Sequence, residues 1–434
     1  MGYNASHYTL NGPPGERSPA AVPQEPDVSE MSQGPAPAAA DVPVLRLKRG
    51  EDRRLTAGHL WVFSNEVDTD ATPLTRFQPG DIVRIESDRH RFLGYAYVNP
   101  RSLICARILS RDPLHPVDKS LFVHRLQVAL SLRRRLYEQP CYRLVYGESD
   151  GLPGLVVDRY DEVLVGQIGT AGMERLKPEI TAALEKVVHP RGLLWRNDSA
   201  ARELEGLPQY VETGFGEIPE AVEVLENGLK FKVPLGGGQK TGWFFDQAAN
   251  RQAFLKYIAG ARVLDVFSYI GAWGLAAARH GATDVTCVDA SAPALELLQE
   301  NAALNEVQVN AVRGDAFDVL EQLHEGKERF DVVVLDPPAF IKRRKDIPKG
   351  QAAYRRLNQL GLQLLARDGL LVSCSCSYHL QEAELLAAIQ KAGRHVGRTV
   401  QVLEFGGQGP DHPVHPAIAE TRYLKCFFCR AVQD

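Results

Sequence analysis

The feature that most constrains the fold is a strand, a glycine-containing turn and a helix in direct succession over residues 262–279. Residues 263–267 are apolar except for Asp265, and a run that is nearly continuous rather than alternating is typical of a buried parallel strand. Gly271 and Gly274 end this run, and residues 275–279 have a good helix-forming composition. Such a unit opens an open α/β sheet, whose ligands bind beyond the carboxyl ends of the strands.

The turn itself narrows the class of ligand. The usual dinucleotide fingerprint has a glycine where Tyr269 stands, because backbone must approach a pyrophosphate there. A nucleotide-like ligand without a pyrophosphate does not need that glycine, and S-adenosylmethionine is such a ligand. We therefore expect S-adenosylmethionine as the cofactor.

Further apolar runs follow, and each ends in polar residues. Asp289 ends the second strand, 18 positions after Gly271, close to where a carboxylate meets ribose hydroxyls in such folds. Later strands lead into Asp315, into Asp336 and into the segment 374–377. The residues expected to bind the cofactor along this edge are Asp265, Phe267, Gly271, Asp289, Asp315 and Asp336.

Length and composition set broader bounds. A chain of 434 residues predicts two or three domains, and its hydrophobic fraction of 44% can support real cores. No apolar run approaches the roughly 18 residues of a membrane span. Seven irregularly spaced cysteines argue against a disulfide framework and for a reducing cytosol, so we expect a cytoplasmic protein without a membrane partner.

The charge distribution divides the amino-terminal half. Residues 1–44 hold one Arg, five acids and eight prolines, which predicts a disordered tail rather than an Arg-rich mitochondrial leader. Residues 45–140 hold 17 Lys and Arg against 11 acids. Alternating strands at 81–86, 92–97 and 104–109 predict a small β-barrel over 45–116. Arg53 and Arg54 are among the arginines expected on its rim, where they either contact RNA phosphates or only face solvent.

Residues 117–235 predict a linker helix and a small α+β domain. The pattern is helical over 117–135 and again over 173–188, a strand covers 155–158, and Asn227-Gly228 predicts a type I′ hairpin turn. The glycine-rich segment 236–242 lacks a Walker pattern and is interpreted as a hinge. It leads into the last domain, residues 236–434.

Eight short stretches match one known family: Gly58-His-Leu-Trp-Val-Phe63, Glu148-Ser-Asp-Gly-Leu-Pro-Gly154, Lys240-Thr-Gly-Trp-Phe-Phe-Asp-Gln247, Asp265-Val-Phe-Ser-Tyr-Ile-Gly271, Asp336-Pro-Pro-Ala-Phe340, Ser373-Cys-Ser-Cys-Ser377, Asp411-His-Pro413 and Tyr423-Leu-Lys425. Through these stretches the chain resembles the bacterial large-subunit ribosomal RNA methyltransferase I family, over everything but the tail. The resemblance implies an α/β protein in which a PUA-like RNA-binding domain and a small α+β domain precede a Rossmann-like methyltransferase domain. It also implies S-adenosylmethionine-dependent formation of 5-methylcytosine in 23S ribosomal RNA. The sequence is compatible with a homodimer. One departure is Ala248, where the family usually has Arg, and Arg251 is the candidate replacement.

The chemistry of cytosine methylation requires a cysteine. Carbon 5 is a poor nucleophile, so a thiolate adds to carbon 6 and creates an enamine that attacks the methyl group. Cys374 and Cys376 both follow the fifth strand, and strand geometry alone does not choose between them. The resemblance places the nucleophile at Cys376. Asp336 ends the neighbouring strand, so we expect it to hydrogen-bond the base edge. Ala339 and Phe340 stand where many such enzymes carry a second cysteine for product release.

Other functions are compatible with parts of this pattern. An adenine-N6 methyltransferase, or one acting on two bases, would use the Asp336 loop, although its aromatic residue comes one place late. An inactive RNA-binding assembly factor would not need the strand-end acids.

Cys426 and Cys429 form a lone CxxC, which favours a place in the buried core over a zinc site, so no metal is expected. The basic run of Lys342, Arg343 and Arg344 borders the expected active site and is predicted to contact RNA phosphates.

Overall fold

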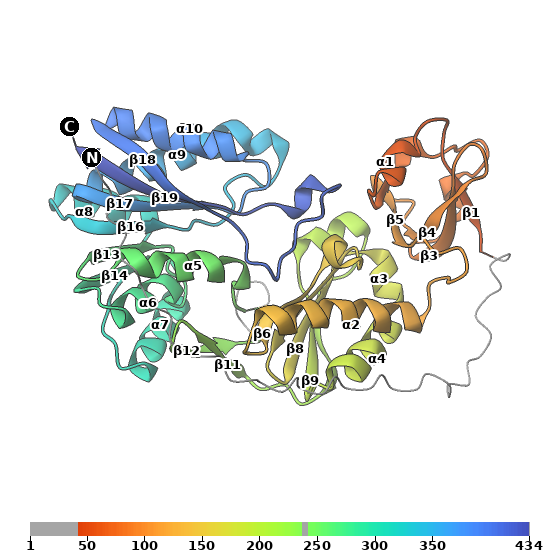
Figure 1. Cartoon of the computed structure of the whole chain (residues 1–434), viewed down its shortest axis with the longest axis horizontal. Coiled ribbons are helices and arrows are strands. Elements are labelled where there is room, and N and C mark those ends of the chain that lie inside the picture. The colour runs from red at the N-terminus through yellow and green to blue at the C-terminus, as the bar shows by residue number, and fades with distance from the viewer. Residues whose placement is uncertain (1–41, 237–241, 434) are drawn as a thin grey trace, which may run out of the picture.

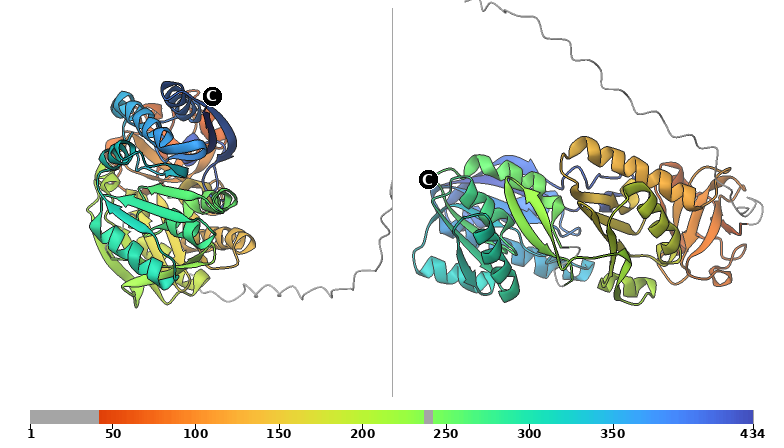
Figure 2. Two further views of the ribbon diagram at one scale, coloured as in Figure 1. Left: turned by 90° about the vertical axis from the view of Figure 1, so that its left-hand side faces the viewer. Right: turned by 90° about the horizontal axis from the view of Figure 1, so that it is seen from below.

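The computed structural model describes residues 42–236 and 242–433, arranged around three large sheets that lie in a row (Figures 1 and 2). Residues 1–41 of the predicted disordered tail lie outside the described residues. Residues 237–241 of the predicted glycine hinge also lie outside them. The α/β class and the order of a small β domain, an α+β domain and a Rossmann-like domain are confirmed. No helix among the described residues is long and apolar enough to cross a bilayer.

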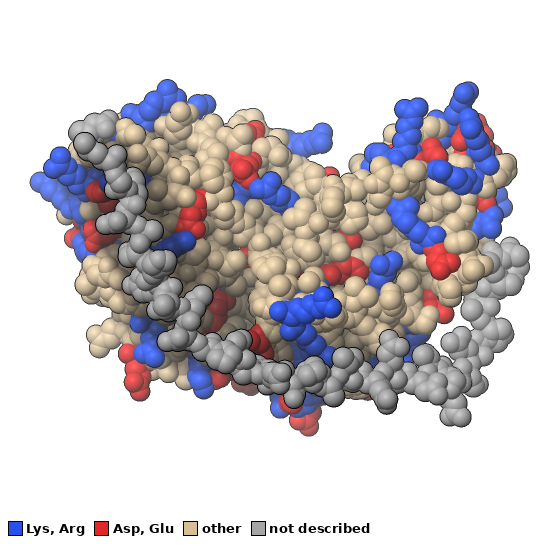
Figure 3. Space-filling view, in the orientation of Figure 1, with Lys and Arg blue, Asp and Glu red and all other residues tan. Residues whose placement is uncertain are grey.

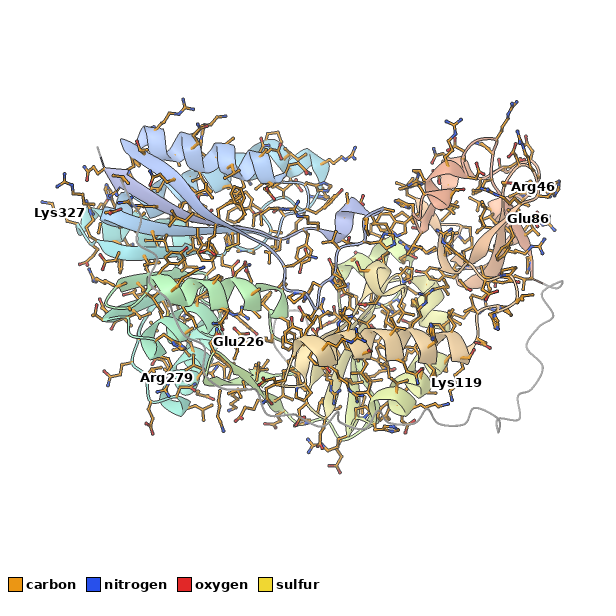
Figure 4. The ribbon with its side chains drawn as sticks, viewed as in Figure 1. Arg46, Glu86, Lys119, Glu226, Arg279 and Lys327 are labelled. Atoms are coloured by element: carbon orange, nitrogen blue, oxygen red, sulfur yellow. The ribbon has the colours of Figure 1, made fainter. Side chains whose placement is uncertain are left out.

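The amino-terminal sheet has the strand order β1-β3-β4-β5-β2. The three strands predicted from alternation are β3 (Asp81–Glu86), β4 (Phe92–Val98) and β5 (Ile104–Ser110), joined by β1 (Val44–Arg46) and β2 (Trp61–Phe63). A short helix, α1 (Arg53–Thr56), follows β1. Figure 4 labels Arg46 and Glu86 on this domain, where their side chains approach to 3.9 Å.

The central sheet has the strand order β10-β9-β8-β7-β6, and its strands share one hydrophobic core with the helices that pack on it. Its strands are β6 (Cys141–Tyr146), β7 (Leu155–Tyr160), β8 (Val163–Ile168), β9 (Gly192–Asn197) and β10 (Tyr210–Gly216). The predicted linker helix is α2 (Lys119–Leu136). The single helix predicted over 173–188 is wrong in one respect, because it is two helices, α3 (Ala171–Arg175) and α4 (Lys177–Val188). Pro178 explains the break, since proline suits the first turn of a helix but not its interior.

The hairpin of β11 (Ala221–Glu226) and β12 (Leu229–Pro234) links the central and last domains. Asn227 and Gly228 both have positive φ, 52° and 74°, as a type I′ turn requires. The backbone N–H of Lys232 donates over 2.8 Å to the side-chain oxygen of Asn301, which lies on α7 (Ala292–Leu304). That of Lys230 donates over 2.8 Å to the side-chain oxygen of Asn305, directly after this helix. The hairpin therefore packs against the last domain as well as following the central one.

The last domain contains a seven-stranded sheet of order β15-β14-β13-β16-β17-β19-β18. Helices α8 (Ala316–Glu325), α9 (Ile347–Leu364) and α10 (Glu382–His395) cover one face, and α5 (Ala248–Phe254), α6 (Ala272–Arg279) and α7 (Ala292–Leu304) cover the other (Figure 1). The strands are β13 (Arg262–Val266), β14 (Asp284–Asp289), β15 (Asn310–Arg313), β16 (Phe330–Leu335), β17 (Leu365–Ser375), β18 (Arg398–Gly406) and β19 (Lys425–Gln433). Strands β13 to β17 pair in parallel, and β19 pairs antiparallel with both β17 and β18.

The strand order reverses at β13, which pairs with β14 on one side and with β16 on the other. In open α/β sheets, ligands bind beyond the carboxyl ends of the strands at such a reversal. The expected cofactor-binding residues lie at or directly after the carboxyl ends of β13, β14, β15 and β16, so the topology gathers them at this edge.

Candidate active site

The loop after β13 is held in an uncommon backbone conformation. Phe267 and Tyr269 have φ values of 66° and 50°, in a region that non-glycine residues rarely adopt. The backbone N–H groups of Phe267 and Ser268 both donate to the carbonyl oxygen of Val288, over 2.9 and 3.0 Å. Such strain is concentrated at ligand-binding sites, because surrounding contacts must enforce it. The loop is therefore shaped before any ligand binds.

Gly274 shows why the start of α6 needs a glycine. A Cβ at this position would lie 2.3 Å from the sulfur of Cys287. The backbone N–H of Gly274 donates to Oδ2 of Asp265 over 2.9 Å. Helix and strand thus approach closely enough for the buried carboxyl to bond to the helix.

Asp265 is fully buried beneath the loop. Burial raises the pKa of Asp265 to about 8, with the charges of Asp336 and Asp289 acting in the same direction. Its Oδ2 holds Gly274, whereas its Oδ1 has no hydrogen-bond partner in the described part of the chain. An orphaned carboxyl oxygen at the carboxyl end of β13 fits a cofactor with cationic groups, such as S-adenosylmethionine.

Asp289 and Asp315 stand at the ends of the next two strands. The carboxylate of Asp289 accepts the backbone N–H groups of Tyr269 and Ser291, over 2.9 and 2.8 Å. Asp315 is exposed and caps α8 by accepting the N–H of Phe317 over 2.9 Å. Asp289 therefore holds the loop after β13 in place and also lies at the carboxyl edge of the sheet. Asp315 adds a second carboxylate after the neighbouring strand.

Asp336 follows β16 and is fixed by two side chains. Gln247 Nε2 donates to its Oδ1 over 2.8 Å, and Trp273 Nε1 donates to its Oδ2 over 3.1 Å. Burial raises the pKa of Asp336 to about 6, and the charge of Asp246 adds to this, while the two N–H donors oppose it. The carboxyl is held in one orientation and is easier to protonate than an exposed aspartate.

The two candidate cysteines lie in different surroundings. Cys374 is buried in β17, opposite Cys426 of β19, with the sulfur atoms 3.2 Å apart. Burial raises the pKa of its thiol well above the usual value, so it is an inert thiol. Cys376 is half-buried, follows the end of β17, and its sulfur lies 3.9 Å from the carbonyl oxygen of Pro337. The structure thus brings Cys376 and the Asp336 loop together.

The loop that carries Cys376 is anchored by hydroxyl groups. The hydroxyl of Tyr354 lies 2.9 Å from both Ser375 Oγ and Ser377 Oγ, and all three are buried. Ser377 Oγ also accepts the backbone N–H of Ile341 over 3.1 Å. The serines on either side of Cys376 therefore tie its loop to α9 and to the segment after Asp336.

Lys425 is a functional candidate that the sequence reasoning did not single out. It is only 6% exposed, and its ammonium donates to the carbonyl oxygens of Ser377 and Tyr423, over 2.6 and 2.7 Å. Burial lowers the pKa of Lys425 to about 8, and the neighbouring Cys376 charge acts in the opposite direction. A buried cation thus lies within electrostatic reach of the thiol. The only signal for it was its place in the Tyr423-Leu-Lys425 stretch.

Gln247 and Trp273 were also missed as partners of Asp336. Trp273 is 3% exposed and packs in the core, and its indole N–H also donates to Asp336. Arg251, the candidate replacement at the Ala248 departure, is buried and pairs with Glu226, over 2.7 Å between Nη2 and Oε2. Figure 4 labels Glu226, which ends β11 near α5. Because Arg251 of α5 is paired with this hairpin residue, its role is structural.

The expected RNA-binding residues differ in their exposure and in whether they already pair with an acid of this chain. Lys342, Arg343 and Arg344 are exposed directly after the Asp336 loop, and Arg343 Nε lies 3.2 Å from Asp346. Arg53 is exposed on α1. Arg54 instead binds Glu66, over 2.6 Å, within its own domain. In Figure 3 the upper outline dips between the last domain and the amino-terminal domain, and Lys and Arg side chains stand on both sides.

Cys426 and Cys429 are buried in β19. Among the described residues, no group of three His, Cys, Asp or Glu side chains is arranged to hold a metal ion.

Comparison with known proteins matches both ends of the chain. The family profile described as a PUA-like domain matches residues 45–111, and that of the S-adenosylmethionine-dependent methyltransferases matches residues 195–422. A curated relative, ribosomal RNA large subunit methyltransferase I of Aeromonas salmonicida, is 37% identical over 395 residues, covering 89% of this chain and 99% of the relative. The protein of the same name from Vibrio cholerae is 35% identical over 400 residues, covering 90% and 100%.

Two solved structures share the whole fold. SMU.776, described as a methyltransferase and complexed with SAH, superposes with a TM-score of 0.77 at 23% identity, covering 90% of this chain and all of that one. A second, described as a SAM-dependent methyltransferase from Streptococcus mutans, gives a TM-score of 0.76 at 22% identity over the same shares. The cofactor predicted from the glycine turn is confirmed, since the matched family depends on S-adenosylmethionine.

Proposed function

Because this chain belongs to the ribosomal RNA large subunit methyltransferase I family, we propose that it methylates carbon 5 of a cytosine in 23S ribosomal RNA, with Cys376 as the nucleophile. The observation that carries the proposal is the position of Cys376. It is half-buried just past β17, 3.9 Å from the carbonyl of Pro337 in the loop that presents Asp336. The chain's other cysteine on this strand, Cys374, is buried against Cys426.

Each residue then has a defined task. The target cytosine leaves its stack to reach the thiol, as bases generally must in such enzymes. The sulfur of Cys376 adds to carbon 6. Asp336, oriented by Gln247 and Trp273, donates a hydrogen bond from its protonated carboxyl group to the base edge where negative charge develops. S-adenosylmethionine, when bound, supplies an electrophilic methyl group to carbon 5. Loss of the carbon 5 proton then expels the thiolate and restores the aromatic ring.

The adenine-N6 alternative is less well supported. It needs the aromatic residue after the Asp-Pro-Pro segment to grip a flipped base. Phe340 instead packs within the domain, with its ring 4.8 Å from that of Tyr354 and 6.2 Å from that of Phe317. Such an enzyme would also have no use for the anchored Cys376 loop. The inactive-factor alternative does not explain why Asp265 and Asp289 are held at the cofactor edge.

RNA carrying 5-fluorocytosine tests the mechanism, because fluorine cannot leave carbon 5 as a proton does. Wild-type protein with S-adenosylmethionine should form a covalent complex that survives denaturing electrophoresis. Cys376→Ala should lose this complex, whereas Cys374→Ala should still form it. Both variants should bind the cofactor, because neither thiol is assigned to hold it. Full methylation by Cys376→Ala would overturn the mechanism, and loss of the complex only in Cys374→Ala would move the nucleophile two residues back.

The substrate is tested separately. Bisulfite sequencing of 23S ribosomal RNA, with and without the gene, should reveal one protected cytosine that depends on the protein. An unchanged pattern in the deletion strain would contradict the cytosine assignment, and methylated adenine in its place would favour the alternative.

A further inference from the structure

A cavity of about 260 Å³ lies where the amino-terminal domain, the central domain and the carboxyl-terminal segment meet. Its walls include the rings of Trp61 and Tyr146, the carboxylates of Glu148 and Glu420, and the amide of Gln167. It is separate from the cofactor edge, and the mechanism above does not use it. Two of the stretches that carry the family resemblance, 58–63 and 148–154, contribute residues to its lining.

The aromatic wall is held in place by an acid. Trp61 Nε1 donates to Oε1 of Glu148 over 2.8 Å, which joins β2 to the turn after β6. Trp61 is half-buried, so part of its ring stays accessible. The lining also includes Gly147, Gly154 and Gly169, which add no side chains to the cavity. A flat, partly apolar space beside a tryptophan suits a planar ring.

The charged residues that line the cavity determine which planar ligand it can bind. The guanidinium of Arg196 is committed within the protein, to Asp198 over 2.7 Å and to the carbonyl of Leu235 over 3.3 Å. That of Arg202 is buried and binds the carbonyl of Pro208 over 2.8 Å. Glu148 and Glu420 instead offer carboxylate oxygens. Carboxylates repel a phosphate but accept hydrogen bonds from the amino group of a base.

The cavity is also connected to the catalytic loop. Tyr378, two residues after Cys376, lies close enough to Glu420 for the carboxylate to act on it, and burial and the charge of Glu420 both raise the pKa of the tyrosine. Glu420 belongs to the short helix η8 (Ala419–Thr421) that precedes β19. The loop of Cys376 and the wall of the cavity are therefore neighbours, so one RNA strand can contact both.

We propose that this cavity binds an unpaired nucleobase carrying an exocyclic amino group, stacked on Trp61 and hydrogen-bonded to Glu148 and Glu420. The base belongs to the RNA strand that delivers the target cytosine, so this inference rests on the proposed function and adds a second point of base recognition to it.

Trp61 itself reports on the site. Of the four tryptophans, Trp195, Trp243 and Trp273 are at most 3% exposed, so added ligands should quench mainly Trp61. Titration with CMP, AMP and GMP should give saturable quenching with at least one of them, and none with ribose 5-phosphate. UMP lacks the amino group and should bind at least about 10-fold more weakly than the best ligand, because it loses one hydrogen bond to a charged group.

Variants make the assignment specific. Glu148→Gln should weaken the quenching ligand by about 5-fold or more, whereas Glu203→Gln, an exposed acid outside the lining, should not change it. Trp61→Phe should abolish the fluorescence response. No saturable quenching by any of the three nucleotides, or an equal response to UMP or ribose 5-phosphate, would overturn the proposal. Cys376→Ala separates the two proposals, because it should lose methylation and keep the quenching.

Discussion

The ammonium of Lys425 lies 2.6 Å from the carbonyl oxygen of Ser377, the residue directly after Cys376. Lys425 begins β19, whose antiparallel pairing places it opposite Ser375, directly before Cys376. Arg422, Glu382 and Glu384 are the other charged groups that act on it. A cation in this position favours the thiolate over the thiol, which is the form that adds to a base. Lys425 thus links the last strand of the sheet to the reactivity of the residue assigned as nucleophile.

Replacing Lys425 should slow the reaction of Cys376 with iodoacetamide. In Lys425→Met the rate at pH 7 should fall on the order of 10-fold, and Lys425→Arg should recover much of it, because a nearby cation favours the reactive thiolate. The advantage of the wild type should fade as the pH rises through about 8, where Lys425 loses its charge.

Mass spectrometry of the peptide containing Cys376 measures this rate. Five of the other cysteines are buried, and burial raises the pKa of the half-buried Cys141 to about 11, so they should react slowly. Equal alkylation rates in the wild type and Lys425→Met at pH 7 would limit Lys425 to a structural role.

The affinity for S-adenosylmethionine should rise with pH because of Asp265. Burial raises the pKa of Asp265 to about 8, so the free protein holds this carboxyl protonated at neutral pH. The cofactor brings positive charge, which favours the carboxylate, and binding should release a proton. The dissociation constant should therefore fall as the pH rises from 6 to 8, by up to about 10-fold per unit, and level off above 8.

Calorimetry in two buffers with different ionisation enthalpies measures the released proton directly. Asp265→Asn keeps an acceptor for the N–H of Gly274 but cannot ionise, so both the proton release and the pH dependence should disappear. A wild-type affinity that is flat between pH 6 and 8 would contradict this role.

Local patterns in the sequence predicted the elements that position the site. The nearly continuous apolar run before Gly271 and the polar ends of β14 to β17 were enough to place Asp289, Asp336 and Cys376 at one edge of a parallel sheet. These features depend on strand periodicity and on chain order, which a single sequence contains. The uncommon φ of Phe267 and Tyr269 carried no such signal, because neither residue is a glycine.

Pairings between distant residues were not predictable in the same way. Gln247 and Asp336 are 89 positions apart, and β19 enters the sheet between β17 and β18 although it is last in the chain. No local periodicity encodes these contacts, so the partners of Asp336 and the position of Lys425 were missed. Arg54 shows the converse, because an arginine in a basic segment is bound to Glu66 of its own domain.

Asp289→Ala should weaken the binding of S-adenosylmethionine by about 1–3 kcal/mol, the value of a charge-assisted hydrogen bond. The substitution also frees the N–H groups of Tyr269 and Ser291, so the loop loses part of its enforced shape. Asp284→Ala, at the amino end of the same strand, is the matched control and should leave the affinity unchanged. Unaltered affinity in a folded Asp289→Ala protein would remove Asp289 from the site.

The basic segment after the Asp336 loop should contribute to RNA affinity through its interactions with phosphates. Arg343→Gln combined with Arg344→Gln removes two exposed charges close to the site, and Arg134→Gln combined with Arg135→Gln removes two exposed charges on α2 as a matched control. Removing one arginine–phosphate interaction should lower the slope of log affinity against log salt by about 0.7 for single-stranded RNA, because fewer bound cations are released. Fluorescence anisotropy over a series of salt concentrations measures both slopes. The first pair should bind RNA more weakly at low salt and show the shallower slope, while the control pair should match the wild type. If both pairs change alike, the charge near the active site acts only through the overall field of the protein.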